Sequence, residues 1–256
     1  EWEKDCGPLA STAAIEVMDY FGVKSDDQIG RMFPMIQARA AARLNAAAGV
    51  PVSPSGLSRA DVRISQHRRA YADFFALDEY DLSFRRFDGQ ETDIVKRAVF
   101  MGGDAAIVLP YDPVRDVVLL VEQMRMGPLG RGDPDVWQLE PVAGRLDAGE
   151  TPQQTASRET LEEAGVELYA LENVADCYPS PGASSEFFYI YVGLADLPDK
   201  ANGTGGLDSE NEDIRVHLIG FDALMAMLDR GQIRNAPLVL ATLWLARHRD
   251  RLRNTA

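Results

Sequence analysis

The sequence has few cysteines and no long apolar run. Two cysteines, Cys6 and Cys177, are too few and too far apart for a disulfide framework or a zinc site, so we expect two reduced thiols in a cytoplasmic protein. The longest apolar stretch, "APLVLATLWLA", falls short of the roughly 18–20 residues that span a bilayer, and it predicts a packed helix. These features exclude a disulfide-stapled scaffold and a membrane-spanning helix.

Basic residues are also scarce. The chain has 26 Lys and Arg against 40 Asp and Glu, which gives a formal net charge of −14. Without a basic excess there is no general attraction to phosphate backbones, so we expect neither nucleic acid nor a membrane as a partner. If the substrate is itself anionic, the protein needs a divalent metal and a few well-placed arginines.

The chain has three segments that differ in sequence pattern and predicted secondary structure. Residues 1–55 read as a helical extension, with Pro8 in a first helical turn, a cap at Ser25 and a break or kink near Pro34. The linker "VPVSPSG" separates them from residues 60–100, whose alternating pattern predicts a small antiparallel sheet. Residues 101–256 combine strands and helices and form the predicted catalytic domain.

The predicted elements of the last segment favour an α+β sandwich. Apolar runs predict strands, acidic and amphipathic stretches predict helices, and a Gly/Asp/Asn-rich stretch at 199–213 predicts a loop. The predicted strands are 95–101, 104–111, 116–125, 136–143, 173–179, 186–195 and 214–220, and the helices are 152–164, 221–231 and 235–252.

One segment, 144–166, adds five carboxylates to an already acidic chain. Thr151 and Gln154 match a capping box, Pro152 suits the first helical position, and Gly165 is a suitable left-handed stop. The helix between these signals therefore begins near Pro152 and ends at Gly165.

Three glutamates of this helix, Glu159, Glu162 and Glu163, share one face because they are three and four residues apart. A solvated charged face is the ordinary explanation of such a pattern. Like charges at this spacing oppose helix formation, however, and the helix contains one cation, Arg158. Bound Mg²⁺ or Mn²⁺ explains the charge better, since hard cations take carboxylate oxygens as ligands.

The spacing resembles the Nudix box. Gly144 is followed after five residues by Glu150 and after seven more by "RETLEEAGV", and Thr160 alone departs from the pattern, at a position where the family prefers an aliphatic residue. The resemblance implies the Nudix α/β/α sandwich with a mixed sheet. It also implies an enzyme that hydrolyses a nucleoside diphosphate linked to another moiety and holds metal on this helix.

A second sequence motif indicates which branch of the Nudix family the chain resembles. Pro181 lies sixteen positions after Gly165, in "YPSPGASSE", which is similar to the mark of ADP-ribose pyrophosphatases. Further similarity covers roughly residues 60–252, and the chain is also similar to Nudix proteins associated with bacterial tellurite resistance. The resemblance implies Mg²⁺-dependent hydrolysis of ADP-ribose to AMP and ribose 5-phosphate. It also implies a homodimer that exchanges residues 60–100.

The resemblance assigns metal ligands and their supports. It implies that Glu159, Glu163 and the carbonyl of Ala143 hold the metals, and that Glu150 and Arg158 support the helix and its loop.

The resemblance places the general base on a distant loop. It implies that Glu210 activates water and that Glu212 adds a metal contact. A mobile acidic loop is a plausible lid, although a plain polar loop has the same composition. The competing assignment puts the base on the acidic helix, at Glu162 or Glu163, and Glu162 is the second catalytic candidate.

Substrate contacts follow from the same resemblance. Arg97 and Arg125 match phosphate-contacting arginines, and Arg145 is a further candidate, although surface ion pairs are the commoner role of a lone arginine. Phe74 and Phe75 match aromatics that reach the adenine from the partner subunit, although core packing explains them nearly as well. The contacts predicted for adenosine and ribose are Ser180, Pro181, Gly182 and Glu186.

Two other functions stay open. One keeps the enzyme class with a nucleotide sugar or another dinucleotide as substrate. The other is a non-catalytic sensor of an ADP-ribose-type ligand, linked to tellurite resistance. The complete set of glutamates in the box argues against the sensor, since binding alone does not need them all.

Overall fold

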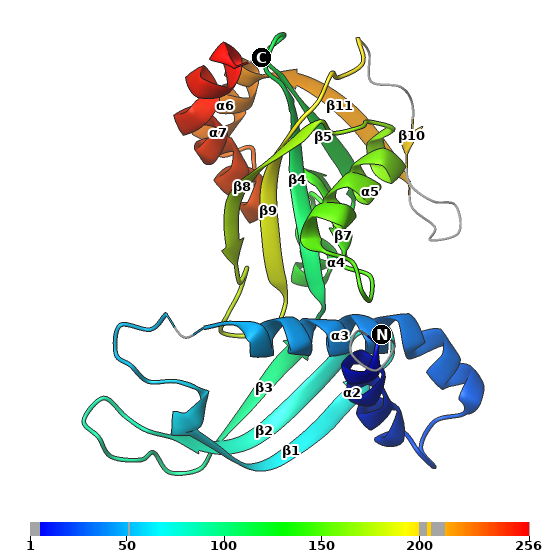
Figure 1. Cartoon of the computed structure of the whole chain (residues 1–256), viewed down its shortest axis with the longest axis vertical. Helices are drawn as coiled ribbons and strands as arrows, with labels where there is room; N and C mark the ends of the chain where they lie inside the picture. Colours follow the sequence, from blue (N-terminus) through cyan, green and yellow to red (C-terminus); the bar gives the residue numbers. More distant parts are fainter. Residues whose placement is uncertain (1–5, 51, 200–203, 206–212, 256) are drawn as a thin grey trace. The chain divides into compact units, whose positions relative to one another are not determined.

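A computed structural model describes residues 6–50, 52–199, 204–205 and 213–255. Contacts between residues divide the chain into two compact units (Figure 1). Unit 1 comprises residues 1–104, 147–149 and 180–187, and unit 2 comprises residues 105–146, 150–179 and 188–256.

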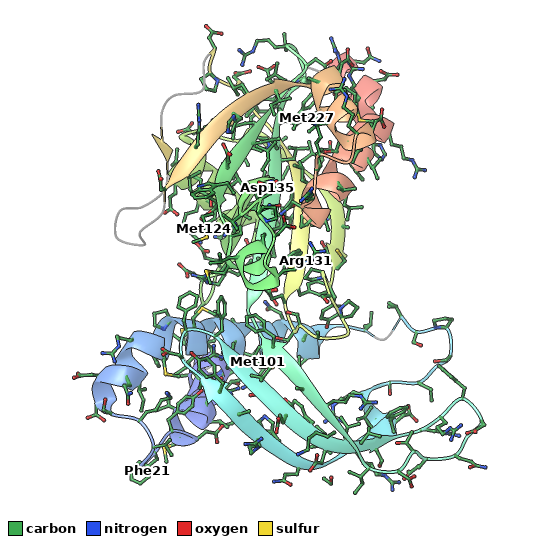
Figure 2. The ribbon with its side chains drawn as sticks, turned by 180° about the vertical axis from the view of Figure 1, so that it is seen from behind. Phe21, Met101, Met124, Arg131, Asp135 and Met227 are labelled. Carbon is green, nitrogen blue, oxygen red and sulfur yellow. The ribbon has the colours of Figure 1, made fainter. Side chains whose placement is uncertain are left out.

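The sheet of unit 1 has three antiparallel strands in the order β1-β2-β3. A 3-10 turn at Arg59–Asp61, capped by Ser58, leads into the first strand. The strands are β1 (Val62–Ala72), β2 (Ala76–Phe84) and β3 (Val95–Met101), and Met101 marks the end of β3 in Figure 2. The small antiparallel sheet predicted from the alternating pattern is therefore present.

Two helices precede this sheet, α2 (Gly7–Met18) and α3 (Asp26–Ala48). Pro8 lies in the first turn of α2, and Ser25 closes a full capping box with Gln28 at the start of α3. Of the break or kink expected near Pro34, a break is not present, because α3 continues through this residue as one helix. The helices share a small core with Ala72 of β1, which joins them to the sheet within unit 1.

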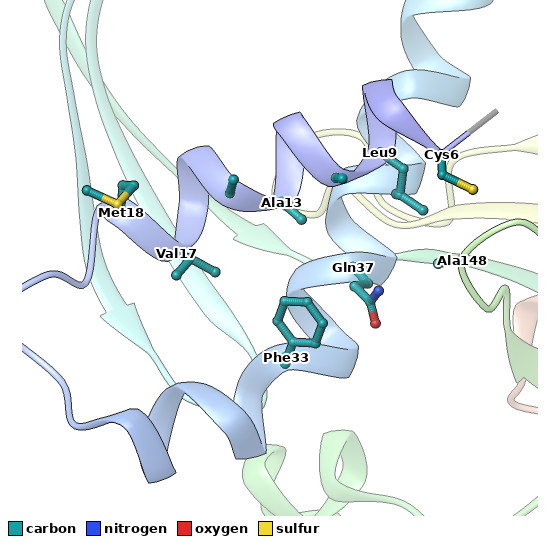
Figure 3. Close-up of a pocket in the computed structure, with 10 residues that line it drawn as sticks. Cys6, Leu9, Ala13, Val17, Met18, Phe33, Gln37 and Ala148 are labelled. Carbon is teal, nitrogen blue, oxygen red and sulfur yellow. The ribbon is translucent and has the colours of Figure 1, made fainter. Parts of the chain in front are cut away.

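An apolar pocket of about 480 Å³ lies between the two helices (Figure 3). Leu9, Ala13 and Val17 of α2 face Phe33 and Gln37 of α3 across it. The small alanine side chains of α2 leave this space, so the packing between the helices is incomplete on that side. The connection between them carries Phe21, which is 81% exposed (Figure 2).

Unit 2 contains an eight-stranded sheet with β10-β11-β5-β4-β9-β8 as its main order. Two short strands lie off this path, since β6 pairs with β5 and β7 pairs with β4. The strands are β4 (Asp104–Asp112), β5 (Val117–Met124), β6 (Trp137–Glu140), β7 (Val142–Arg145), β8 (Ala170–Cys177), β9 (Phe187–Leu194), β10 (Thr204–Gly205) and β11 (Ile214–Gly220). The predicted loop at 199–213 thus contains a two-residue strand, β10.

Helices cover both faces of this sheet. On one face α6 (Phe221–Asp229) and α7 (Ala236–Asn254) pack on side chains such as Leu109 and Leu120. On the other face α5 (Pro152–Ala164) packs through Ala156 on Val108 and Leu119. Alternate residues of each strand point to opposite faces, so one strand contributes to both cores. This confirms the predicted α+β sandwich.

One helix was not predicted, α4 (Met126–Arg131). Its six residues include two glycines and a proline, so neither periodicity nor propensity indicates a helix there. Among the described residues, none of the helices combines the length and the hydropathy that crossing a membrane would require.

Candidate active site

The acidic helix α5 begins and ends at the predicted residues. The Thr151 hydroxyl accepts a hydrogen bond from the backbone N–H of Gln154 at 3.3 Å, and the Gln154 side chain accepts one from the N–H of Thr151 at 2.8 Å. Gly165 ends the helix with a φ of 64°, which favours glycine. Local signals alone therefore fix both ends of the segment that carries the glutamates.

Arg158 lies at the centre of the carboxylate cluster. Its Nε and Nη2 donate to the two oxygens of Glu150 at 2.9 Å each. Its Nη1 donates to Glu159 at 2.8 Å and to Glu162 at 2.9 Å, and Nη2 reaches the Arg145 carbonyl at 3.3 Å. The hydrogen bonds that Arg158 donates to Glu150 raise the pKa of Arg158 above its ordinary value, with further contributions from Glu159. One guanidinium therefore offsets part of the repulsion among three carboxylates.

Glu159 also lies directly against Gly144 of β7, the strand beside α5 (Figure 1). A Cβ atom added at Gly144 would fall 1.9 Å from both Cδ and Oε1 of Glu159. No side chain larger than hydrogen fits without displacing the carboxylate. The preceding residue, Ala143, pairs with Ile107 of β4, which fixes the strand that carries the predicted carbonyl ligand.

These residues fit a divalent metal by their chemistry. The cradle at Gly144 holds a carboxylate beside the backbone of Ala143, and both supply the hard oxygen atoms that Mg²⁺ prefers. Glu163, one residue beyond Glu162, is 3% exposed, and burying a carboxylate is costly without compensation. Within the described ranges, no three acidic, His or Cys side chains converge as a finished metal site. Glu159, Glu163 and the Ala143 carbonyl would hold the ion.

Thr160, the one departure from the box pattern, is fully buried. Its hydroxyl donates to the Ala156 carbonyl at 2.7 Å, one helical turn earlier. A buried hydroxyl is costly only when it lacks a partner, so threonine replaces an aliphatic residue here without an unsatisfied group.

The predicted phosphate-contacting arginines are positioned in different ways. Arg125, which precedes α4, donates to Glu140 at 2.7 Å, and Glu140 also accepts from Asn235 at 3.0 Å. Arg97 on β3 is exposed and donates to the Lys96 carbonyl at 2.8 Å. Arg145 lies at the end of β7, paired with Ala105. Sequence reasoning missed Glu140, because its partners are 15 and 95 residues away.

In unit 1 the predicted adenosine contacts form a compact turn. The Ser180 carbonyl accepts from the N–H groups of Ala183 and Ser184 at 3.1 and 2.9 Å. Glu186 accepts from the Ser184 hydroxyl at 3.3 Å and packs on Gly102, where an added Cβ would fall 2.2 Å from Glu186 Cγ. The absence of a side chain at Gly102 therefore determines where Glu186 lies. Pro181 and Gly182 form the exposed tip of the turn.

The two predicted adenine-contacting aromatics lie in the turn between β1 and β2. The rings of Phe74 and Phe75 meet edge to face at 4.8 Å, and the Phe75 ring lies 4.8 Å from that of Phe100. The backbone of Phe100 in turn bonds to Ala183 and Ser185 at 2.9 Å each. Phe100 therefore links the aromatic turn to the Ser180–Glu186 segment within unit 1. Glu210 and Glu212, the predicted base and added metal contact, lie outside the described residues.

The acidic helix α5 lies against the glycine-bearing strand β7 of an α+β sandwich, and the NUDIX domain model matches residues 101–241, more than half of the chain. The chain therefore belongs to the Nudix family and is a Nudix hydrolase.

Individual relatives support the predicted branch. The chain is 40% identical to the ADP-ribose pyrophosphatase of Escherichia coli (strain K12), over 78% of this chain and 95% of the relative. It is 34% identical to the ADP-ribose pyrophosphatase of Haemophilus influenzae, over 73% and 87%, and 34% identical to a GDP-mannose pyrophosphatase of Cronobacter sakazakii, over 65% and 85%. A crystal structure of an ADP compounds hydrolase shares the fold, with a TM-score of 0.60 and 20% identity, over 77% of this chain and 100% of that one. The predicted resemblance to ADP-ribose pyrophosphatases is confirmed.

Proposed function

We propose that this protein hydrolyses ADP-ribose to AMP and ribose 5-phosphate with the help of Mg²⁺, for which Mn²⁺ can substitute. The observation that carries the proposal is the cradle in which the Glu159 carboxylate lies against Gly144. The similarity to ADP-ribose pyrophosphatases over 78% of the chain supports the choice of substrate.

Each group has a part in this scheme. Glu159, Glu163 and the Ala143 carbonyl hold the metal, which when bound neutralises the pyrophosphate and polarises a phosphorus atom. Glu150 orients Arg158, which in turn holds Glu159 and Glu162 in place. Arg97, Arg125 and Arg145 supply positive charge to the phosphates.

The general base is Glu210 in this proposal. It takes the proton of the attacking water. Glu212 contributes to metal binding. Ser180, Pro181, Gly182 and Glu186 contact the adenosine and ribose, and Phe74 and Phe75 reach the adenine across a homodimer that exchanges residues 60–100.

A second substrate class has its own support. The chain covers 85% of a GDP-mannose pyrophosphatase at 34% identity, so a nucleotide sugar is the alternative substrate. The part of the site that recognises the nucleobase decides between ADP-ribose and GDP-mannose, since adenine and guanine differ in their hydrogen-bonding groups.

The test is a substrate panel with identified products. Purified protein is incubated with ADP-ribose, GDP-mannose and UDP-glucose in ¹⁸O-labelled water with Mg²⁺, and products are identified by mass spectrometry. We expect AMP and ribose 5-phosphate, with one ¹⁸O in one product and kcat/KM for ADP-ribose at least about tenfold above the others. Preference for GDP-mannose would establish the alternative. Tight binding of ADP-ribose without turnover would indicate the sensor.

A further inference from the structure

A buried network of charged side chains joins the N-terminal helices to the small sheet. Glu16 of α2 accepts hydrogen bonds from Nε and Nη2 of Arg39 on α3, at 3.0 and 2.5 Å. The same carboxylate oxygen lies 2.5 Å from Nη1 of Arg69 on β1, and Arg69 donates to Asp78 on β2 at 2.7 and 3.1 Å. Glu16, Arg39 and Asp78 are at most 1% exposed. Breaking such a pair leaves a buried charge uncompensated, so the network holds the four elements together.

Arg39 also reaches the turn between β1 and β2. Its Nη1 donates to the Phe74 carbonyl at 3.4 Å. The turn is closed by a 2.8 Å hydrogen bond from the N–H of Asp73 to the carbonyl of Phe75. A residue on the N-terminal helices is therefore bonded to the backbone of the segment that carries both predicted adenine-contacting rings.

Both aromatic residues of the turn are partly exposed. Phe74 and Phe75 are 47% and 40% exposed, and the Phe75 ring also contacts that of Phe100. The guanidinium of Arg39, in contrast, is fixed by two hydrogen bonds to Glu16. A rigid donor on the turn backbone lowers the ordering cost of binding, because the turn is already in one arrangement.

We propose that Arg39 is a positioning residue for adenine: held by Glu16, it fixes the Phe74–Phe75 turn and thereby tightens binding of the adenine end of the substrate. This inference rests on the proposed ADP-ribose activity. It gives residues 7–48 a part in substrate recognition, although none of them belongs to the Nudix domain match.

Arg43 provides a matched control. It lies one helical turn after Arg39 on α3 and pairs with the other oxygen of Glu16 at 3.7 Å. Its side chain is 37% exposed, and among the described residues it makes no hydrogen bond to the turn. Both arginines support Glu16, and Arg39 alone of the two also holds Phe74.

The experiment compares wild type, Arg39→Met, Arg39→Lys and Arg43→Met in the full chain. For each protein we measure kcat and KM for ADP-ribose and the inhibition constants of the two products. AMP contains the adenine, and ribose 5-phosphate does not. We expect both Arg39 variants to raise KM and the AMP constant about 2- to 10-fold, the range that one aromatic contact contributes. The kcat and the ribose 5-phosphate constant should stay within about twofold, and Arg43→Met should match wild type.

A structural role alone would lower the active fraction, and hence kcat, without moving KM. Unchanged KM and AMP constants in the Arg39 variants, or equal shifts in Arg43→Met, would overturn the inference while leaving the proposed function intact. A wild-type protein that fails to hydrolyse ADP-ribose would overturn the proposed function and the inference with it. If Arg39→Met does not fold, Arg39→Lys decides, because it keeps a positive charge beside Glu16.

Discussion

At the scale of single residues, the position of Glu159 depends on the absence of a side chain at Gly144. The Glu159 carboxylate occupies the place that a Cβ would take, and the strand cannot move because Ala143 and Gly144 pair with Ile107 and Ala106. The glycine is therefore required by the close approach of a carboxylate and not by its backbone angles.

Gly144→Ala tests this requirement. The new methyl group must displace Glu159, whose flexible carboxylate end can move without disturbing the core. We expect kcat/KM for ADP-ribose to fall on the order of 10²-fold, as for a misplaced catalytic group, with little change in Tm. Gly130→Ala on α4, where an added Cβ meets nothing within 4 Å, should retain activity. A fully active Gly144→Ala protein would show that Glu159 is not needed where it lies.

The assignment of the base belongs to the same scale. Glu210→Gln keeps the length and hydrogen-bonding reach of the side chain and removes its capacity to accept a proton. We expect single-turnover hydrolysis at saturating Mg²⁺ to slow about 10²–10⁴-fold, with substrate affinity little changed. Glu162→Gln is the comparison, because Glu162 accepts a hydrogen bond from Arg158. A nearly normal Glu210 variant beside an inactive Glu162 variant would place the base on α5.

At the scale of elements, the two ends of α5 favour the helix, and the like charges in its interior destabilise it. Its capping box and glycine stop favour the helix, whereas like charges three and four residues apart oppose it. Arg158 compensates part of this repulsion, and a divalent ion would compensate more.

Mg²⁺ should therefore stabilise the protein as well as activate it. A ligand that binds only the folded state contributes about 2.7 kcal/mol at a hundredfold excess over Kd, which gives a rise in Tm of roughly 5–10 °C for a chain of this size. We expect this rise in Tm in thermal melts of the wild type, and we expect it to be absent in Glu159→Gln and in Glu163→Gln.

Chelator should abolish activity, and added Mg²⁺ or Mn²⁺ should restore it. Full activity in chelator would contradict the metal site.

The sheet of unit 1 carries a pH-sensitive element at Asp78. Burial alone would raise the pKa of Asp78, but hydrogen bonds from Arg69 and His67 outweigh it and hold the pKa below the usual 3.8. A lowered pKa contributes stability that is present above pH 3.8 and is lost as the pH falls through the folded-state value.

Urea unfolding of wild type and Asp78→Asn at several pH values measures this contribution. The difference in midpoint should be largest near pH 7 and should shrink below pH 3.8. Asp88→Asn, in an exposed turn, is the control and should behave as wild type does at every pH. A wild-type advantage that persists undiminished at pH 2 would show that the carboxylate charge is not what stabilises this sheet.

At the scale of the whole molecule, the N-terminal helices and the small sheet have separable roles. Removing residues 1–55 takes away Glu16 and Arg39 but leaves Arg69 paired with Asp78. Both remaining charges keep a partner and gain solvent, so the sheet should stay folded. We expect a dimer with near-normal kcat and a raised KM. Removing residues 1–93 should abolish dimer and activity.

Light scattering with size-exclusion chromatography gives the assembly state, and steady-state kinetics give the two constants. An active monomer after the longer truncation would contradict the exchanged dimer. Loss of all activity after the shorter one would instead show that the helices are required for folding.

The strands and helices of the Nudix sandwich could be predicted because their signals are local. Alternation marks strands, and Thr151, Pro152 and Gly165 fix α5, each through its own neighbours. The missed helix, α4, contains residues that disfavour helices, so its formation depends on the surrounding fold.

The sequence by itself determined the family, the acidic helix and the residues of the box, because these depend on spacing along the chain. The tertiary structure decided which groups meet. Arg39 and Glu16 are 23 residues apart, Arg39 and Phe74 are 35 apart, and Arg125 and Glu140 are 15 apart. No periodicity or turn signal records such pairs, because they form only when separate elements pack together. The contact of Gly144 with Glu159 is of the same kind, since a strand and a helix must pack before a missing side chain has any consequence.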